Sequence, residues 1–168
     1  MSQASRSILF VCMGNICRSP AADGLFADYL DKHHPSAAGE IRVDSAGTHG
    51  YHVGEAADQR MRQAAAVRGY RLESRARRVT ADDLTHFDLV LAMDRDNLAI
   101  VQSLENETEL EATAVIALFS DFLDDSWPTD VPDPYYGGAE GFEYVLDMIE
   151  AGCPSILERL VTIDRNRG

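Results

Sequence analysis

The sequence has no apolar run long enough to cross a membrane and few of the features of a secreted protein. A membrane-spanning helix needs about 20 consecutive apolar residues, and no stretch of this chain approaches that length. Residues 1–7 lack the hydrophobic segment of a signal peptide. The three cysteines are an odd number, which does not suggest a disulfide framework, and no Cys/His spacing resembles a zinc site. We therefore expect a cytoplasmic protein with reduced thiols and without a metal or other cofactor.

Basic residues are also scarce. The chain has 15 Lys and Arg against 28 Asp and Glu, which gives a formal charge of −13. Nucleic acids and anionic membranes bind basic patches, so we expect neither as a partner. A length of 168 residues with 45% hydrophobic content is enough for one compact domain and too short for two comfortable ones. We predict a single domain over residues 1–168, and a monomer.

Short apolar runs alternate with helical patterns along the chain. Four runs have the composition of buried strands: Ile8–Val11, Glu40–Ser45, Phe87–Met93 and Ala112–Phe119. Amphipathic helical patterns separate them, and a further helix over residues 142–163 closes the chain, with Pro154 expected to kink it or restart it near Gly152. The alternation predicts an α/β fold: a doubly wound four-stranded parallel sheet flanked by helices.

The loop after the first strand carries a nucleophile and a cation. Five residues separate Cys12 from Arg18, and Ser19-Pro20 predicts a helix start with the Ser19 hydroxyl as N-cap. A loop from a strand end to a helix start directs backbone N–H groups into one concavity, which suits an oxyanion. Arg18 can bind two phosphate oxygens, and its charge favours the thiolate of Cys12. The spacing alone is also compatible with a buried structural cysteine and a solvated arginine.

The complete segment is more specific than that spacing. Cys12-Met13-Gly14-Asn15-Ile16-Cys17-Arg18-Ser19-Pro20 resembles the phosphate-binding loop of the low-molecular-weight protein tyrosine phosphatases, including its asparagine and second cysteine. The resemblance implies that Cys12 is the nucleophile, that Arg18 clamps the phosphate, and that Ser19 hydrogen-bonds the Cys12 sulfur. It further implies a loop shape held by Asn15 and a substrate contact surface made by the loop: Met13, Gly14, Asn15, Ile16, Cys17 and Ser19.

A second motif lies near the other end of the chain. In Val131-Pro132-Asp133-Pro134-Tyr135-Tyr136, prolines on both sides stiffen the backbone around Asp133. These residues also fit an ordinary turn. However, Asp-Pro-Tyr resembles the general-acid motif of the same family, which implies that Asp133 acts first as acid and then as base. Tyr135 and Tyr136 would supply aromatic walls for a phenyl group.

Three further segments bear on the shape of the loop and pocket. Asp44-Ser45-Ala46-Gly47 resembles the family segment whose serine hydrogen-bonds the loop asparagine, which predicts a bond between Ser45 and Asn15. Tyr51 falls where the family has a bulky residue on the pocket wall, although a loop aromatic covering the core edge fits equally well. Ser74 stands where many members have a histidine that orients the asparagine, so weaker support for Asn15 is expected. A cluster of nearby arginines fits a solvated face as well as it fits a specific role: Arg71, Arg75, Arg77 and Arg78.

The resemblance implies a metal-independent protein tyrosine phosphatase that hydrolyses phosphotyrosine in proteins through a cysteinyl-phosphate intermediate. Reversible disulfide formation between Cys12 and Cys17 is a further hypothesis, because it would protect the nucleophile from over-oxidation. Two other classes stay open. Arsenate reductases resemble this loop but need more cysteines, and the only distant one is Cys153, on an apolar helix face. A non-catalytic anion-binding or phosphocarrier module would have no use for Asp133.

Overall fold

A parallel sheet of four strands forms the centre of the protein. The computed structural model describes residues 6–108 and 111–163. Its strands are β1 (Arg6–Cys12), β2 (Ile41–Gly47), β3 (Leu89–Ala92) and β4 (Val115–Leu118), in the order β2-β1-β3-β4. This order confirms the predicted doubly wound parallel sheet. In such sheets ligands bind at the carboxyl ends of the strands, where the winding reverses, which here is beside β1.

The apolar residues of β1 alternate between two cores, because successive side chains of a strand point to opposite faces. Ile8 and Phe10 belong to the larger core, whereas Leu9 and Val11 belong to the smaller one, and all four are fully buried. Burial on both faces explains why this strand is a continuous apolar run in the sequence.

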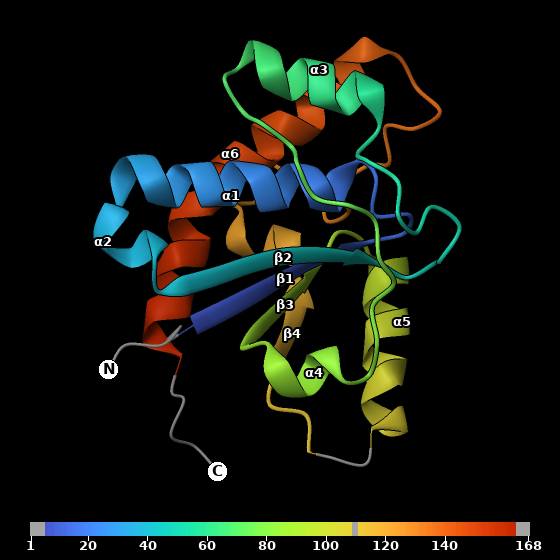
Figure 1. The fold of residues 1–168 in the computed structure, drawn as a ribbon, viewed down its shortest axis with the longest axis vertical. Coiled ribbons are helices and arrows are strands. Elements are labelled where there is room, and N and C mark those ends of the chain that lie inside the picture. The colour runs from blue at the N-terminus through green and yellow to red at the C-terminus, as the bar shows by residue number, and fades with distance from the viewer. Residues whose placement is uncertain (1–5, 109–110, 164–168) are drawn as a thin grey trace.

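Helices cover both faces of the sheet (Figure 1). α1 (Arg18–His33) and α6 (Ala139–Thr162) pack over the larger core, and α4 (Asp83–His86) and α5 (Arg95–Leu104) over the smaller one. α3 (Gln59–Val67) packs against α6, and α2 (Pro35–Ala38) follows α1. Two short 3-10 helices, η1 (Glu105–Glu107) and η2 (Phe119–Phe122), complete the elements of the described residues.

The structure differs from the prediction in three details. α1 begins at Arg18 and no side chain caps it, because the Ser19 hydroxyl has partners elsewhere in the loop. Of the kink or restart predicted at Pro154, the restart near Gly152 does not occur, because α6 continues through Pro154. β4 is shorter than predicted, because the N–H groups of residues 113 and 114 donate to the carbonyl of Leu84 instead of to β3.

Within the described residues, no helix combines the length and apolarity that a membrane span requires. The predicted single domain over residues 1–168 extends beyond the described residues and stays a prediction.

Candidate active site

A cavity of about 150 Å³ opens at the carboxyl end of β1. Nine of the residues predicted for the site line it, together with His52: Cys12, Met13, Gly14, Ile16, Cys17, Arg18, Asp133, Tyr135 and Tyr136. The loop of residues 12–18 and the segment of residues 133–136 therefore meet at one cavity, although they lie near opposite ends of the chain.

Cys12 sits at the base of the cavity beside a serine hydroxyl. It is only 2% exposed, and its Sγ lies 3.0 Å from Ser19 Oγ. The same hydroxyl oxygen accepts a hydrogen bond from Asn15 Nδ2 at 2.8 Å, and it lies 3.3 Å from the carbonyl oxygen of Ala46 on β2. Ser19 therefore joins the cysteine to the interior of the loop and to the neighbouring strand.

Asn15 adopts a backbone conformation that most residues avoid. Its φ of 58° makes it the one non-glycine residue with positive φ among residues 6–108 and 111–163. This conformation costs roughly 1–2 kcal/mol for most residues and less for asparagine. The buried side chain holds it in place, because Nδ2 donates to Ser19 and Oδ1 accepts from the backbone N–H of Arg77 at 2.9 Å. Gly47 allows β2 to approach the loop, since a Cβ there would lie 2.7 Å from the Met13 carbonyl oxygen.

The predicted bond between Ser45 and Asn15 was wrong. Ser45 Oγ donates instead to Asp23 Oδ2 on α1, at 3.2 Å, and Arg77 takes the position at Asn15 Oδ1. Burial raises the pKa of Asp23 to about 7; the hydrogen bond from Ser45 opposes this shift, and the charge of Asp44 adds to it. Ser45 thus contacts a half-buried carboxyl beside the loop and not the loop itself.

Arg18 is held at the cavity by groups from two other segments. Its side chain is 3% exposed, and Nη1 donates to Asp94 Oδ2 at 2.7 Å and to the carbonyl of Val131 at 3.0 Å. Nη2 lies 3.7 Å from Asp133 Oδ2. Burial alone would lower the pKa of Arg18, but the charges of Cys12, Asp94 and Asp133 raise it above its ordinary value. The guanidinium is therefore a fixed cation at the cavity.

Asp133 is partly open to solvent, with a side chain 33% exposed. Its Oδ1 accepts the backbone N–H of Tyr135 at 3.0 Å, which fixes the carboxyl relative to its own loop. The Tyr135 ring lies beneath the guanidinium of Arg60, 5.2 Å from Cζ to the ring centroid, and packs edge-on against Tyr136. Tyr136 is 86% exposed.

The loop after β2 contributes a histidine, not the predicted tyrosine. Tyr51 is 82% exposed, stacks on His49 and does not line the cavity. His52 does line it, and its Nδ1 lies 3.2 Å from Glu55 Oε2. Spacing could not distinguish the two, because an irregular loop has no fixed side-chain period.

The other two cysteines are buried and carry no disulfide. Burial raises the pKa of Cys17 well above its ordinary value, and the neighbouring charges of Asp58, Cys12 and Asp133 raise it further. Cys17 therefore keeps its proton beside Cys12. Cys153 lies in α6, where its Sγ donates to the carbonyl of Ile149 at 3.3 Å, and it does not line the cavity.

No group of three or more His, Cys, Asp or Glu in the described part of the chain is arranged to hold a metal ion. The acidic residues before Asp133 have partners of their own. Asp124 accepts hydrogen bonds from Ser126, and Asp130 pairs with Arg95 at 3.1 Å.

Comparison with known proteins agrees with this geometry. The family described as low molecular weight phosphotyrosine protein phosphatase matches residues 7–166. A low molecular weight protein-tyrosine-phosphatase of Streptomyces coelicolor is 41% identical over 152 residues, which are 89% of this chain and 90% of the relative.

A crystal structure of a protein tyrosine phosphatase from Entamoeba histolytica matches with a TM-score of 0.84 and 40% identity, over 94% of this chain and 97% of that chain. A Drosophila arginine phosphatase structure matches with a TM-score of 0.85 and 28% identity, over 94% and 99%. The chain therefore belongs to the low molecular weight protein tyrosine phosphatase family, whose members are hydrolases.

Proposed function

We propose that the protein hydrolyses phosphotyrosine and related aryl phosphate monoesters through a cysteinyl-phosphate intermediate, without a metal ion. The observation that carries the proposal is the meeting of a buried cysteine, a fixed arginine and a partly exposed carboxyl at one cavity: Cys12, Arg18 and Asp133. A nucleophile, an anion clamp and an acid are the three groups that this chemistry requires.

In the first step, the Cys12 thiolate attacks phosphorus. A sulfur–phosphorus bond forms while the bond from phosphorus to the ester oxygen breaks. Arg18 binds two phosphate oxygens, and the backbone N–H groups of the loop stabilise the remaining charge. Asp133 donates its proton to the departing oxygen, so the product leaves as a phenol; a positioned acid of this kind contributes about 10²–10⁴-fold.

In the second step, water attacks the phosphorus of the cysteinyl phosphate. The Asp133 carboxylate accepts a proton from that water, the sulfur–phosphorus bond breaks, and inorganic phosphate leaves. The Cys12 thiolate is thereby restored. Ser19, 3.0 Å from Cys12 Sγ, donates a hydrogen bond to the sulfur as it becomes a leaving group.

The cavity walls favour a flat aromatic substrate. Tyr135 and Tyr136 stand beside Asp133, so a phenyl ring can pack against them while its phosphate rests on the loop. Because one structural neighbour is an arginine phosphatase, phosphoarginine is the substrate to compare with phosphotyrosine. Phosphotyrosine-containing proteins in the cytoplasm are the partners we expect, and the monomeric state stays a prediction.

The two alternative classes need other features. An arsenate reductase would need a further cysteine, outside the loop, to relay a disulfide from it, and the one distant cysteine, Cys153, is 3% exposed within α6 and outside the cavity lining. A non-catalytic anion-binding module would need the loop but not a carboxyl aimed at its arginine, and Asp133 Oδ2 lies 3.7 Å from Arg18 Nη2.

Hydrolysis of an aryl phosphate at about pH 6 with a chelator present tests the proposal. The wild type is compared with Cys12→Ser and Asp133→Ala, and phosphotyrosine is compared with phosphoarginine. We expect turnover with chelator that Cys12→Ser abolishes and Asp133→Ala strongly reduces. Reduced wild-type protein that hydrolyses neither substrate would reject the proposal, and a preference for phosphoarginine would reject the substrate assignment.

A further inference from the structure

The orientation of the Asn15 side-chain amide is set by a single backbone group. The N–H of Arg77 lies 2.9 Å from the Asn15 amide, and an N–H can only donate, so the amide atom facing it must be the oxygen. The amide nitrogen must then face Ser19 Oγ, to which it donates at 2.8 Å. Asn15 is 2% exposed, so water cannot easily replace either partner.

The orientation of the Asn15 amide determines where the Ser19 hydroxyl proton points. Ser19 Oγ accepts from Asn15 and has one proton to donate, and its two remaining partners are Cys12 Sγ at 3.0 Å and the carbonyl oxygen of Ala46 at 3.3 Å. A hydrogen bond to an ionised sulfur is stronger than one to a neutral carbonyl. The hydroxyl therefore stabilises the thiolate of Cys12 as long as Asn15 keeps its orientation.

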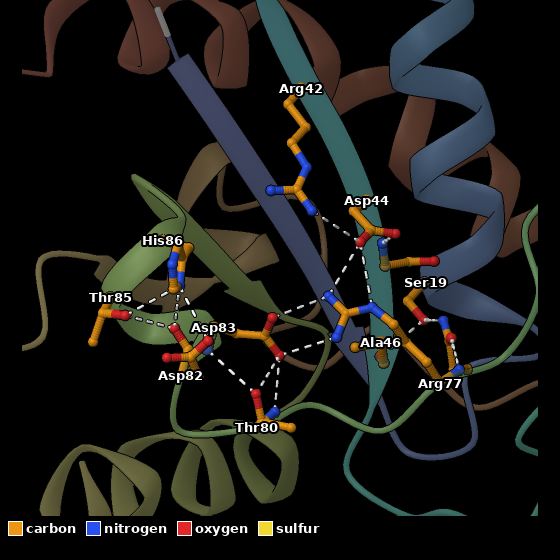
Figure 2. Close-up of polar contacts among 12 residues, drawn as sticks. Ser19, Arg42, Asp44, Ala46, Arg77, Thr80, Asp82, Asp83, Thr85 and His86 are labelled. Atoms are coloured by element: carbon orange, nitrogen blue, oxygen red, sulfur yellow. Dashed lines mark hydrogen bonds and ion pairs between the residues drawn. The ribbon is translucent and has the colours of Figure 1, made fainter. Parts of the chain in front are cut away.

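The Arg77 side chain is held on both sides by carboxylates (Figure 2). Nη1 and Nη2 donate to the two oxygens of Asp83 on α4, at 3.1 and 3.2 Å, and Nε and Nη2 donate to Asp44 Oδ2 on β2, at 3.3 and 3.1 Å. The guanidinium is 34% exposed and Asp83 only 12%. Burial alone would lower the pKa of Arg77, but Asp83 and Asp44 raise it. We call these three residues the Arg77 clamp.

The backbone around Arg77 is hydrogen-bonded to β2, the strand that also carries Asp44 of the clamp. The N–H of Gly47 donates to the Arg77 carbonyl at 2.8 Å, and the N–H of Val79 donates to the Gly47 carbonyl at 2.8 Å. Gly47 is also the residue whose lack of a Cβ leaves room for the Met13 carbonyl. The side chain of Arg77, through the clamp, and its backbone, through Gly47, are therefore both attached to β2, and together they position the N–H that faces Asn15.

We propose that Arg77 is a positioning residue for the nucleophile: its guanidinium, held by Asp44 and Asp83, fixes the backbone N–H that orients Asn15, and through Ser19 it stabilises the thiolate of Cys12. The role rests on the phosphatase function proposed above. The N–H that faces Asn15 belongs to the same segment as Ser74, which stands where the family resemblance implies an asparagine-orienting histidine.

The test is the pH dependence of Cys12 alkylation by iodoacetate, read on fragments of the peptide that contains Cys12, together with kcat and KM for an aryl phosphate. Arg77→Met removes the clamp, and Arg77→Lys keeps a charge there. Arg68→Met is the matched control, since Arg68 also pairs with several carboxylates, Glu143, Asp147 and Glu150, but joins α3 to α6 away from the loop. Thermal unfolding of each variant measures the loss of stability.

We expect Arg77→Met to move the midpoint of alkylation to higher pH and to lower kcat about tenfold while KM changes less than about twofold, because one hydrogen bond to the sulfur is weakened. Arg77→Lys should recover part of the loss, and Arg68→Met should leave the alkylation midpoint and kcat near wild type. An alkylation profile for Arg77→Met that matches the Arg68→Met profile would overturn the proposal.

The test stays decisive if Arg77→Met does not fold, and it is independent of the phosphatase function. If Arg77→Met does not fold, Asp83→Asn replaces it, because Asp44 then still holds the guanidinium and a smaller shift in the same direction is expected; no shift would again overturn the proposal. If wild-type protein hydrolyses no phosphate ester but its alkylation still depends on Arg77, the positioning role stands and the phosphatase function fails.

Discussion

Asp94 anchors Arg18 while it caps a helix. Its Oδ2 accepts from Arg18 Nη1 at 2.7 Å, and its Oδ1 accepts the N–H of Asn97 at 2.8 Å at the start of α5. A carboxylate that is fixed to a helix end is a rigid support for the guanidinium that we propose binds phosphate. The orientation of Arg18 thus depends on a residue 76 positions away in the sequence.

Replacing Asp94 should separate these two roles. Asp94→Ala loses the cap and the ion pair, so we expect a loss of about 1–3 kcal/mol of unfolding free energy and a KM for aryl phosphate raised roughly tenfold. Asp94→Asn keeps a capping side chain, so it should lose less stability but show a similar rise in KM. Denaturant unfolding and steady-state kinetics measure both; an unchanged KM in both variants would contradict this role for the ion pair.

The dependence of rate on the leaving group tests Asp133 as an acid. Asp133→Asn cannot supply a proton, so hydrolysis of esters with a basic leaving group should slow by about 10²–10⁴-fold. Esters whose leaving group is already a stable anion should slow much less, because they need no proton. A series of substituted aryl phosphates gives the comparison. An equal loss across the series would mean that the carboxyl does not donate the proton.

The half-buried carboxyl of Asp23 should make stability depend on pH. Its pKa in the folded protein is about 7, whereas an unfolded chain has a value of about 3.9. The folded state therefore binds the proton more tightly, and stability falls as pH rises from about 4 to about 7. Asp23→Asn should remove this loss and gain about 1–2 kcal/mol over wild type at about pH 8, with no gain at about pH 4. If the unfolding free energies of the two proteins change with pH in parallel, Asp23 is not the cause of the pH dependence.

The Cys12–Cys17 disulfide hypothesis can be tested with peroxide. Peroxide oxidises the Cys12 thiolate to a sulfenic acid, and the Cys17 sulfur displaces water from it to form the disulfide. Treated wild-type protein should regain activity with a thiol reductant, whereas the Cys17→Ser variant should lose its activity irreversibly at the same dose. Because burial raises the pKa of Cys17, closure should be faster at higher pH. Wild-type protein that stays inactive after reduction would count against the hypothesis.

The sequence was sufficient where chemistry and fold are encoded in a short segment. The run from Cys12 to Pro20 contains the strand end, the loop and the helix start. The alternation of short apolar runs with helical patterns predicted the parallel sheet, at whose edge this loop forms a cavity. Asp133 was predicted because prolines on both sides and the following tyrosines form a recognisable motif, and the structure places it in the lining of the same cavity.

The sequence was insufficient where a partner comes from a distant segment. The Asn15 side chain bonds a backbone N–H at residue 77, which no side-chain pattern can reveal. Asp94 reads only as a helix cap until the structure brings Arg18 beside it. Tyr51 and His52 are neighbours in an irregular loop, so only the folded backbone decides which one faces the cavity.

Trapping the covalent intermediate tests the account most directly. Asp133→Ala is mixed with an aryl phosphate, quenched in acid and analysed by intact-mass and fragment mass spectrometry, with Cys12→Ser as the control. We predict that the protein gains the mass of one phosphoryl group, located on Cys12, and that Cys12→Ser gains none. Turnover without any phosphoryl group on Cys12, or a phosphoryl group on another residue, would contradict the proposed mechanism.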